Sequence, residues 1–427
     1  VAQPVVTVER LGAAGDGIAH LAGERLFLPY TLPGERWRVR LGRRVHGGRR
    51  AEPLERLEGP ERAIPPCPHF GRCGGCALQH LPGPLYRDFK IARILEPLAR
   101  RGLAPRSLDP PASSPLGSRR RLRLAWRRQG RRVRLGFRAP RSHAVVAVSR
   151  CPVARGELVA LLAPLAALLA RLPAAGAGGE ALLTGLESGV DLLLDWSEDP
   201  GAVECERLAA FAEERDLARL SLRLPGSATA EPVVVRRQPL LRYGPFAVPF
   251  PPGAFLQATA EGEAALRSFL GEQVREGMRV ADLFAGLGAL SLPFAGRVSR
   301  LALFEVASEA VAAVGEALRA RPGSPVTVAR RDLAKTPLGA EELAAFDLVL
   351  LDPPRAGARV QVERLATAAS PERLVYLSCD PASFARDAAI LAAGGWRLER
   401  LRPVDQFLSA AEVELAALFL RPGGDRA

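Results

Sequence analysis

One cysteine is placed to do chemistry. Cys379 stands at the end of a predicted strand in Leu374–Asp387 (LVYLSCDPASFARD). A thiol that follows a nucleotide-binding half of a chain can act as a nucleophile. Most free cysteines are small buried hydrophobes. The flanking Ser378 and Asp380 in a turn that leaves the strand favour the nucleophile.

A glycine-containing loop precedes this cysteine. Asp282–Gly288 (DLFAGLG) closes one predicted strand and opens a helix, and Gly286 and Gly288 allow the backbone to approach a nucleotide cofactor closely. A G-x-G pattern alone would serve NAD equally well. The acid that starts the loop, Asp282, and the lack of a third glycine for a pyrophosphate turn favour S-adenosylmethionine.

Three further acids follow successive predicted strands. Glu305 ends the second strand, where it could bind ribose hydroxyls, and Asp332 after the third lies near the expected adenine end. Asp352 opens the loop Leu351–Gly357 (LDPPRAG) at the end of the fourth strand. An acid before two prolines is expected to be rigid and exposed, and D-P-P loops occur in methyltransferases that act on bases.

Four cysteines form a separate group near the N-terminus. They follow the pattern C-x5-C-x2-C with one distant member: Cys67, Cys73, Cys76 and Cys151. Four thiolates in this asymmetric array suit an iron–sulfur cluster or a structural zinc ion. His69 and His80 keep zinc open as an alternative.

The catalytic candidates require a sheet to position them. From Pro249 onward strands alternate with helices, which indicates a parallel doubly wound α/β sheet. Seven strands with a tightly joined terminal pair favour the methyltransferase variant of the Rossmann architecture. The predicted strands are Arg279–Phe284, Leu301–Glu305, Val326–Ala329, Leu348–Leu351, Leu374–Ser378, Leu398–Arg402 and Glu412–Leu420.

The preceding chain divides into two further predicted domains. Five short strand-like runs before Leu57 indicate an OB-type β-barrel over residues 1–60. A central α+β domain, 61–245, holds the cysteines, a helix over Tyr86–Arg101, a basic hairpin over Arg119–Arg138 and a buried helix over Leu158–Leu172; part of 81–118 could pack on the catalytic domain, 246–427.

Composition narrows the class of protein. The 427 residues carry a formal net charge of +13, and almost all of the cations are arginines, which suit phosphate and base stacking. A GC-rich genome explains arginine over lysine but not the excess charge, so we expect a polyanionic partner. We find no membrane span and no signal peptide, and expect a cytoplasmic protein whose cysteines bind metal.

The ordered motifs together resemble one family, the RNA uracil-5-methyltransferases that carry a 4Fe–4S cluster. The resemblance covers nearly the whole chain. It is carried by a TRAM-like segment (Gly15–Gly17, Phe27–Pro29, Leu32–Glu35), the cysteine knuckle through Gln79, Cys151-Pro152, Phe255-Leu256-Gln257, DLFAGLG, LDPPRAG, SCDPASFARD and Val404–Glu414.

The resemblance implies roles for individual residues. It implies a structural 4Fe–4S cluster on Cys67, Cys73, Cys76 and Cys151. It also implies cofactor contacts by Gln257, Phe284, Glu305, Asp332 and Asp352, a nucleophile at Cys379 and a general base at Glu414, with Asp352 completing the catalytic set.

The chain departs from the family where the base stands. Glu412 replaces the histidine of the usual H-V-E. Residues two apart on a strand face the same side. We therefore expect Glu412 and Glu414 to be neighbours, with the pKa of one raised by the other.

The implied reaction is methylation of uracil carbon 5 in structured RNA. Cys379 would add to carbon 6 of a flipped uridine, and carbon 5 would then attack the methyl group of S-adenosylmethionine. The TRAM-like segment and the cysteine knuckle favour 23S ribosomal RNA. No coiled coil suggests anything other than a monomer, and no obligatory protein partner is evident. Transfer RNA, cytosine carbon 5, and a catalytically weak RNA-binding factor stay as alternatives.

Overall fold

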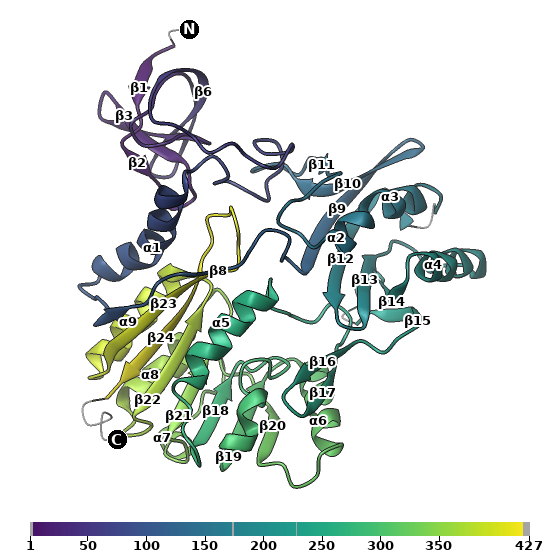
Figure 1. Cartoon of the computed structure of the whole chain (residues 1–427), viewed down its shortest axis with the longest axis vertical. Coiled ribbons are helices and arrows are strands. Elements are labelled where there is room, and N and C mark those ends of the chain that lie inside the picture. The colour runs from purple at the N-terminus through teal and green to yellow at the C-terminus, as the bar shows by residue number, and fades with distance from the viewer. Residues whose placement is uncertain (1–2, 173–174, 228, 422–427) are drawn as a thin grey trace.

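The computed structural model describes residues 3–172, 175–227 and 229–421. Three units follow one another along the chain, and a long segment after the first returns to the last (Figure 1). Among the described residues, no helix combines the length and the apolar character that crossing a membrane requires.

The N-terminal unit is a ring of six strands, of which β5 and β6 are the longest. β1 pairs with β5 while β2, two residues further along, pairs with β3, so one bent strand closes the ring. The remaining pairs are β3 with β4, β4 with β6 and β5 with β6, and the OB type of the barrel stays a prediction. The strands are β1 (Val5–Thr7), β2 (Arg10–Leu11), β3 (Gly17–Leu21), β4 (Glu24–Leu28), β5 (Arg36–Val45) and β6 (Gly48–Glu58).

The central unit is built on a seven-stranded sheet in the order β11-β10-β9-β12-β13-β14-β15. The predicted basic hairpin is confirmed as β9 and β10, with Leu122, Leu124 and Leu135 buried beneath it. The elements are β9 (Arg121–Gln129), β10 (Arg132–Arg138), β11 (Val145–Ala147), α2 (Gly156–Ala160), α3 (Leu162–Ala170), β12 (Gly178–Leu186), β13 (Gly189–Asp195), α4 (Ala202–Glu214), β14 (Leu217–Arg223) and β15 (Glu231–Val235).

The single helix predicted over Leu158–Leu172 is wrong in one respect. The structure has two helices, α2 and α3, which meet at Leu161. A helix accommodates proline in its first turn but not in its interior, because proline lacks the N–H group that an interior residue donates. Pro164 therefore lies in the first turn of α3 rather than in the middle of one long helix.

The C-terminal sheet has nine strands, with a path β20-β19-β18-β21-β22-β24-β23-β7 and β8 also on β23. All seven predicted strands are present, and β24 runs antiparallel to both β22 and β23. The strands are β7 (Ser107–Leu108), β8 (Ala112–Ser113), β18 (Arg279–Leu283), β19 (Arg300–Glu305), β20 (Val326–Arg330), β21 (Leu348–Leu351), β22 (Arg373–Ser378), β23 (Arg397–Asp405) and β24 (Glu414–Leu420); a hairpin of β16 (Leu240–Tyr243) and β17 (Phe246–Pro249) lies apart.

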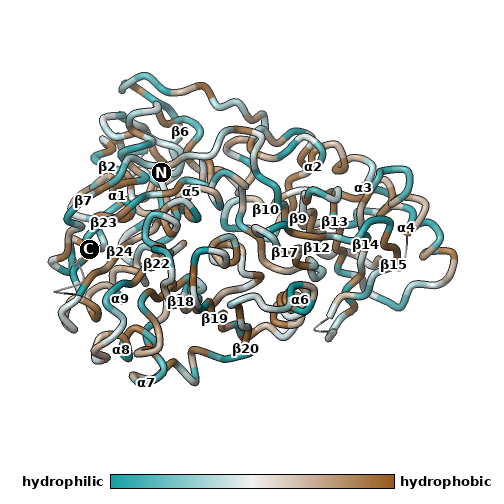
Figure 2. The backbone as a smooth tube through the Cα atoms, turned by 60° about the horizontal axis from the view of Figure 1, so that its bottom comes forward, coloured by the Kyte–Doolittle hydropathy of each residue, from teal (hydrophilic) through white to brown (hydrophobic). Residues whose placement is uncertain are grey.

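Helices cover both faces of this sheet. Alternate strand residues enter different cores: Val280 packs with the helices of one face and Ala281 with those of the other. Figure 2 shows hydrophobic colour concentrated along the strands of the two large sheets. The helices are α1 (Gly83–Ala99), α5 (Ala260–Gly271), α6 (Ser308–Arg319), α7 (Ala340–Leu343), α8 (Arg359–Thr367) and α9 (Pro381–Ala393), with a 3-10 turn (Leu292–Arg297) after β18.

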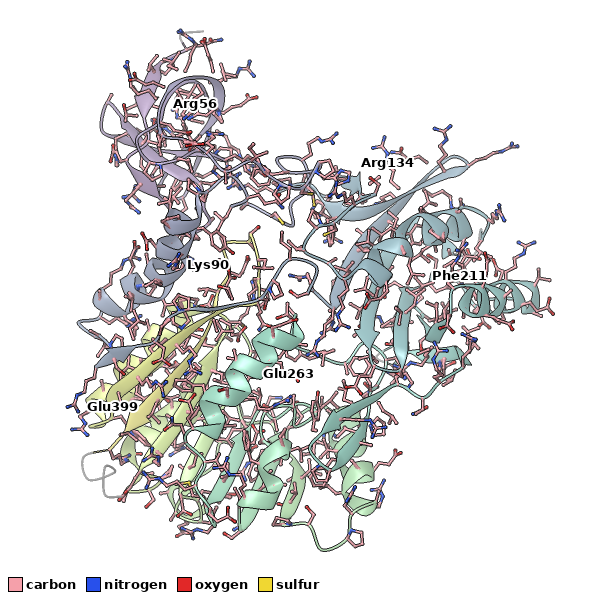
Figure 3. The ribbon with its side chains drawn as sticks, in the orientation of Figure 1. Arg56, Lys90, Arg134, Phe211, Glu263 and Glu399 are labelled. Carbon is pink, nitrogen blue, oxygen red and sulfur yellow. The ribbon has the colours of Figure 1, made fainter. Side chains whose placement is uncertain are left out.

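The segment that contains α1, β7 and β8 contacts the C-terminal sheet, which we call the catalytic sheet. β7 and β8 extend that sheet at β23, and α1 packs on α9. A buried ion pair joins Arg120 to Glu263 of α5 at 2.5 Å. Figure 3 shows Glu263 on the part of α5 that faces the central unit. The domain boundaries predicted at 60 and 245 stay predictions.

Candidate active site and cysteine cluster

The sheet brings the predicted nucleophile and base to one edge. Cys379 follows β22, and Glu414 begins the antiparallel neighbour β24. Ser378 pairs with Leu415, so the end of one strand meets the start of the other. Asp352 follows β21, which is the parallel neighbour of β22. Three candidate catalytic side chains therefore come from adjacent strand ends.

The Cys379 thiol is half-buried among charged groups. Burial raises its pKa to about 11, and the carboxylates of Glu414 and Asp352 also raise it, while the Arg355 guanidinium lowers it. A thiol with such a pKa is mostly protonated near neutrality. Arg355 was not singled out in the sequence as a thiolate-stabilising cation; its place in LDPPRAG after Asp352 is the only signal.

The predicted base is a buried carboxyl. Glu414 is 3% exposed, and burial raises its pKa to about 8 with a further contribution from Asp352. Burial also raises the pKa of Asp352 to about 7. The expectation of an exposed acid at Asp352 is wrong, because this side chain is partly buried.

The predicted pairing of Glu412 with Glu414 is also wrong. β24 begins at Glu414, so Glu412 lies in the preceding loop and the two-residue period of a strand does not apply. The backbone carbonyl of Glu412 accepts a hydrogen bond from Lys90 instead of joining the sheet. Asp352, rather than Glu412, is the carboxylate that raises the pKa of Glu414 after burial.

Gln406 links two of the predicted site residues. Its Nε2 donates to Gln257 Oε1 at 2.7 Å and to Glu414 Oε2 at 2.9 Å. Its Oε1 accepts from the backbone N–H of Ala258 at 2.9 Å. Both polar atoms of the Gln406 amide group are thus hydrogen-bonded within the protein. Sequence reasoning missed this residue, although it lies in the segment that carries the base.

The cofactor loop is shaped around a carboxylate. Phe284, Gly286 and Gly288 all have positive φ, and a Cβ on Gly288 would lie 2.5 Å from Leu292. Glu305 Oε2 accepts from the backbone N–H of Gly286 at 2.8 Å, and its Oε1 accepts from the two N–H groups after it. Glu305 therefore buttresses the loop, and its predicted ribose contact stays a prediction.

Asp282 lies beneath this loop. It accepts a 2.5 Å hydrogen bond from the Ser291 hydroxyl, and burial raises its pKa to about 8 with contributions from Asp352 and Glu305. Asp332 is different: its carboxylate accepts from the N–H of Ala334 and lies 3.2 Å from Lys335. The structure gathers Asp282, Asp352 and Glu305, while Asp332 stands at the next strand, β20.

The four N-terminal cysteines lie close to one another. Burial raises the pKa values of Cys73, Cys76 and Cys151, that of Cys76 to about 11, and the thiol of Cys67 raises all three further. The knuckle docks on the hairpin: a Cβ on Gly74 would lie 2.6 Å from the carbonyl oxygen of Arg138.

The donor chemistry fits a metal group. Four buried or half-buried thiols converge, and backbone N–H groups hydrogen-bond to sulfur, as Gly75 does to Cys73 Sγ at 3.4 Å. Within residues 3–172, 175–227 and 229–421, no three His, Cys, Asp or Glu side chains are arranged so that they could hold a metal ion as they stand. The cluster therefore enters below as a proposal.

Comparison with known proteins places the chain in a family. No family model matches it. An uncharacterized RNA methyltransferase of Brucella suis biovar 1 is 38% identical over 97% of both chains. The 23S rRNA (uracil(1939)-C(5))-methyltransferase RlmD of Pectobacterium atrosepticum is 33% identical over 99% of this chain and 94% of its own length.

A solved structure shares the fold. The crystal structure of Pyrococcus abyssi tRNA (uracil-54, C5)-methyltransferase with S-adenosyl-L-homocysteine matches with a TM-score of 0.74 and 21% identity, over 97% of this chain and 99% of that one. The sequence relatives align along almost the entire chain and exceed 30% identity. The chain belongs to the family of RNA methyltransferases that includes RlmD.

Proposed function

We propose that this RNA methyltransferase transfers a methyl group from S-adenosylmethionine to carbon 5 of a uracil in structured RNA, through a covalent bond from Cys379 to carbon 6. The observation that carries the proposal is the meeting of the Cys379 thiol and the buried Glu414 carboxyl at adjacent strand ends. A nucleophile beside a separate base is what addition followed by elimination requires.

The first step belongs to Cys379. Its thiolate adds to carbon 6, and the electron pair of the carbon 5–carbon 6 double bond moves into an enolate. Negative charge on sulfur is opposed by Asp352 and Glu414 and supported by Arg355. A protonated Glu414, which its raised pKa permits near neutrality, removes part of that opposition.

The last step belongs to Glu414. Bound S-adenosylmethionine would supply an electrophilic methyl group: carbon 5 of the enolate would form the new bond as the sulfur–methyl bond breaks and S-adenosylhomocysteine is left. The sulfur of Cys379 is then a neutral thioether, so no thiolate opposes the ionisation of Glu414, which releases its proton to solvent. Glu414 removes the proton from carbon 5, the double bond re-forms, and Cys379 leaves as a thiolate. Gln406 orients this carboxyl by donating to its Oε2.

We assign the cofactor to the edge lined by Gln257, Asp282, Phe284, Gly286, Gly288, Glu305, Asp332 and Asp352. The support is the glycine-containing loop after β18, where backbone can approach a nucleotide closely. Phe284 opens the loop at a φ of 64°, which turns the chain sharply at the strand end. Open α/β sheets bind ligands at the carboxyl ends of their strands.

We assign a 4Fe–4S cluster to Cys67, Cys73, Cys76 and Cys151, and the TRAM type to the ring of β1–β6. Ligation to a cationic cluster would offset the cost of ionising Cys73, Cys76 and Cys151, whose pKa values burial raises. The cluster would hold the knuckle against the hairpin. The proposed substrate is 23S ribosomal RNA, on the strength of the RlmD relative.

Nucleoside analysis tests this function. Unmodified 23S ribosomal RNA and transfer RNA are incubated separately with the protein and methyl-labelled cofactor, then digested to nucleosides. We expect labelled 5-methyluridine from the 23S sample. Label in 5-methylcytidine, or none in either RNA, would contradict the proposal; label only in transfer RNA would correct the substrate.

A further inference from the structure

The loop that leads to Glu414 is held from outside the catalytic sheet. Residues 406–413 join β23 to β24, and Figure 1 shows this loop rising beside α1. α1 belongs to the segment between the cysteine knuckle and β7, far from the loop in sequence. We call residues 406–413 the base loop, because Glu414 is the next residue.

Lys90 of α1 closes the two ends of the base loop. Its ammonium group donates to Phe407 O at 3.1 Å, to Glu412 O at 2.5 Å and to Asp405 Oδ1 at 2.8 Å. An ammonium group has three N–H donors, and each of them is matched by one of these three acceptors. Lys90 and Asp405 are each 1% exposed, so both charges are buried and each depends on the other. Figure 3 labels Lys90 on α1.

Tyr86, one helical turn before Lys90, holds the middle of the loop. Its hydroxyl donates to Asp405 Oδ2 at 2.5 Å and accepts from the backbone N–H of Ser409 at 3.0 Å. Ser409 has a φ of 59°, which a residue other than glycine rarely adopts unless its surroundings impose it.

The cysteine knuckle completes the attachment. The carbonyl oxygen of Ser409 accepts from the N–H groups of Ala77 and Leu78, at 2.8 and 2.9 Å, directly after Cys76. Both backbone polar groups of Ser409 are therefore bound by segments outside the catalytic sheet. A loop held at its ends and at its strained middle has little freedom to move, and neither has the residue that follows it.

We propose that Lys90, with Tyr86 and Asp405, is a positioning residue that fixes the base loop and thereby places the Glu414 carboxyl for removal of the carbon-5 proton. This inference rests on the base role given to Glu414 above. Lys90 touches none of the reacting groups. Its effect should fall on the elimination step, which needs Glu414, and spare the addition and methyl-transfer steps, which need Cys379 and the cofactor.

The test replaces the buried pair together. Lys90→Met with Asp405→Asn removes both charges and keeps similar volumes, so that no single buried charge is left behind. The matched control is Arg100→Met, which removes an exposed cation at the end of the same helix, paired with Glu96 at 3.1 Å. Single-turnover reactions with RNA report methyl transfer, and denaturing gels report the covalent protein–RNA species.

In the double variant we expect release of methylated RNA to slow by about 10-fold or more, within the range that a positioned base contributes. The methylated covalent species should accumulate, while the methyl-transfer rate and the cofactor dissociation constant stay within about twofold of the parent. Arg100→Met should match the parent. Equal loss of methyl transfer and release, or no accumulation, would overturn the proposal.

A second variant covers a failure to fold. Tyr86→Phe removes the hydroxyl that holds Ser409 and leaves Lys90 and Asp405 paired. It should show the same accumulation, to a smaller extent, and its absence there would equally overturn the proposal. Glu414→Gln is measured beside both. If Glu414→Gln accumulates the adduct and the Lys90–Asp405 and Tyr86 variants do not, only the positioning role of Lys90 is wrong. If Glu414→Gln accumulates none, the base assignment fails.

Discussion

Two cysteine environments in this protein share a raised pKa and its main cause, and they differ in the groups that raise it further. Burial raises the pKa of both Cys379 and Cys76 to about 11. Around Cys379 the further opposition comes from the carboxylates of Glu414 and Asp352. Around Cys76 it comes from the other three thiols of the knuckle. One site is a lone thiol among acids, and the other is a thiol among thiols.

The difference indicates what each site needs in order to ionise. Four converging thiolates would repel one another, so the cluster proposed above would have to supply the positive charge that holds them together. The Cys379 thiolate is repelled by the neighbouring carboxylates, and this repulsion has to be reduced only transiently. Protonation of Glu414 or transfer of the negative charge to a substrate would reduce it. The knuckle is thus suited to a permanent structural role and Cys379 to a covalent cycle.

The largest expected effect is on Cys379. Cys379→Ala should lower methyl transfer by about 10⁴-fold or more, because without the thiolate no enolate forms at carbon 5. Cofactor affinity and thermal stability should stay near those of the parent, since a half-buried thiol on the site edge is removed. Methylation assays, calorimetric cofactor titration and thermal unfolding check the three statements. Retained methyl transfer would break the comparison.

Glu414→Gln should trap the methylated covalent RNA species and slow its release by about 10²–10⁴-fold. The pH dependence has a definite sign. Glu414 raises the pKa of Cys379, so a neutral glutamine lowers that pKa and increases the thiolate fraction at a given pH. Adduct formation in the variant should therefore shift to lower pH. Its rate is followed by quenched single turnovers from about pH 6 to about pH 10; a shift to higher pH would contradict the assignment.

Substitution of a knuckle cysteine should lower metal content and stability, whereas substitution of Cys379 should abolish the chemistry and spare stability. Cys76→Ser should lower iron and sulfide content, reduce thermal stability and loosen the hairpin, because metal-binding free energy is folding free energy in such sites. A protein that still folds should keep adduct formation at Cys379 at a reduced rate. Iron and acid-labile sulfide assays after anaerobic purification check the loading of the parent. Stoichiometric zinc without sulfide would replace the cluster by a zinc site.

Part of this account could be predicted from the sequence and part could not. Seven of the nine strands of the catalytic sheet follow from apolar runs bounded by glycine, proline and acids, whereas β7 and β8 were not predicted. The error at Glu412 arose because Lys90 of α1 takes its carbonyl group, a tertiary interaction that shortens the strand. Gln406 was missed because its role depends on Gln257, 149 residues away in the chain.

The smallest expected effect concerns RNA affinity. Arg132 and Arg134 are exposed on β10, in the hairpin against which the knuckle docks. Figure 3 shows Arg134 on the hairpin, near the top of the central unit. Replacing each by glutamine should reduce the log–log salt slope of RNA binding by about 0.7–0.9 for each phosphate that the arginine neutralises in the parent. The cofactor dissociation constant should not change.

Arg215→Gln at the end of α4, an exposed arginine paired with Glu214, is the matched control for this charge change. Binding isotherms at several salt concentrations give the slopes. Removal of residues before about Pro60 tests whether the barrel also contributes to the salt dependence of RNA binding. Overlaying curves for parent, hairpin variants and truncated protein would mean that RNA is held elsewhere and that the N-terminal units are structural.

The central claim is that Cys379, and no knuckle cysteine, bonds to the target base. RNA in which 5-fluorouridine replaces uridine has no removable proton at carbon 5, so the covalent species should persist after methyl transfer. Peptide mass spectrometry of the protein after nuclease digestion then locates the attached nucleotide. We predict a methylated fluorouridine adduct on the peptide that contains Cys379, and none with Cys379→Ala. An adduct on another cysteine, or one that survives the substitution, would contradict the account.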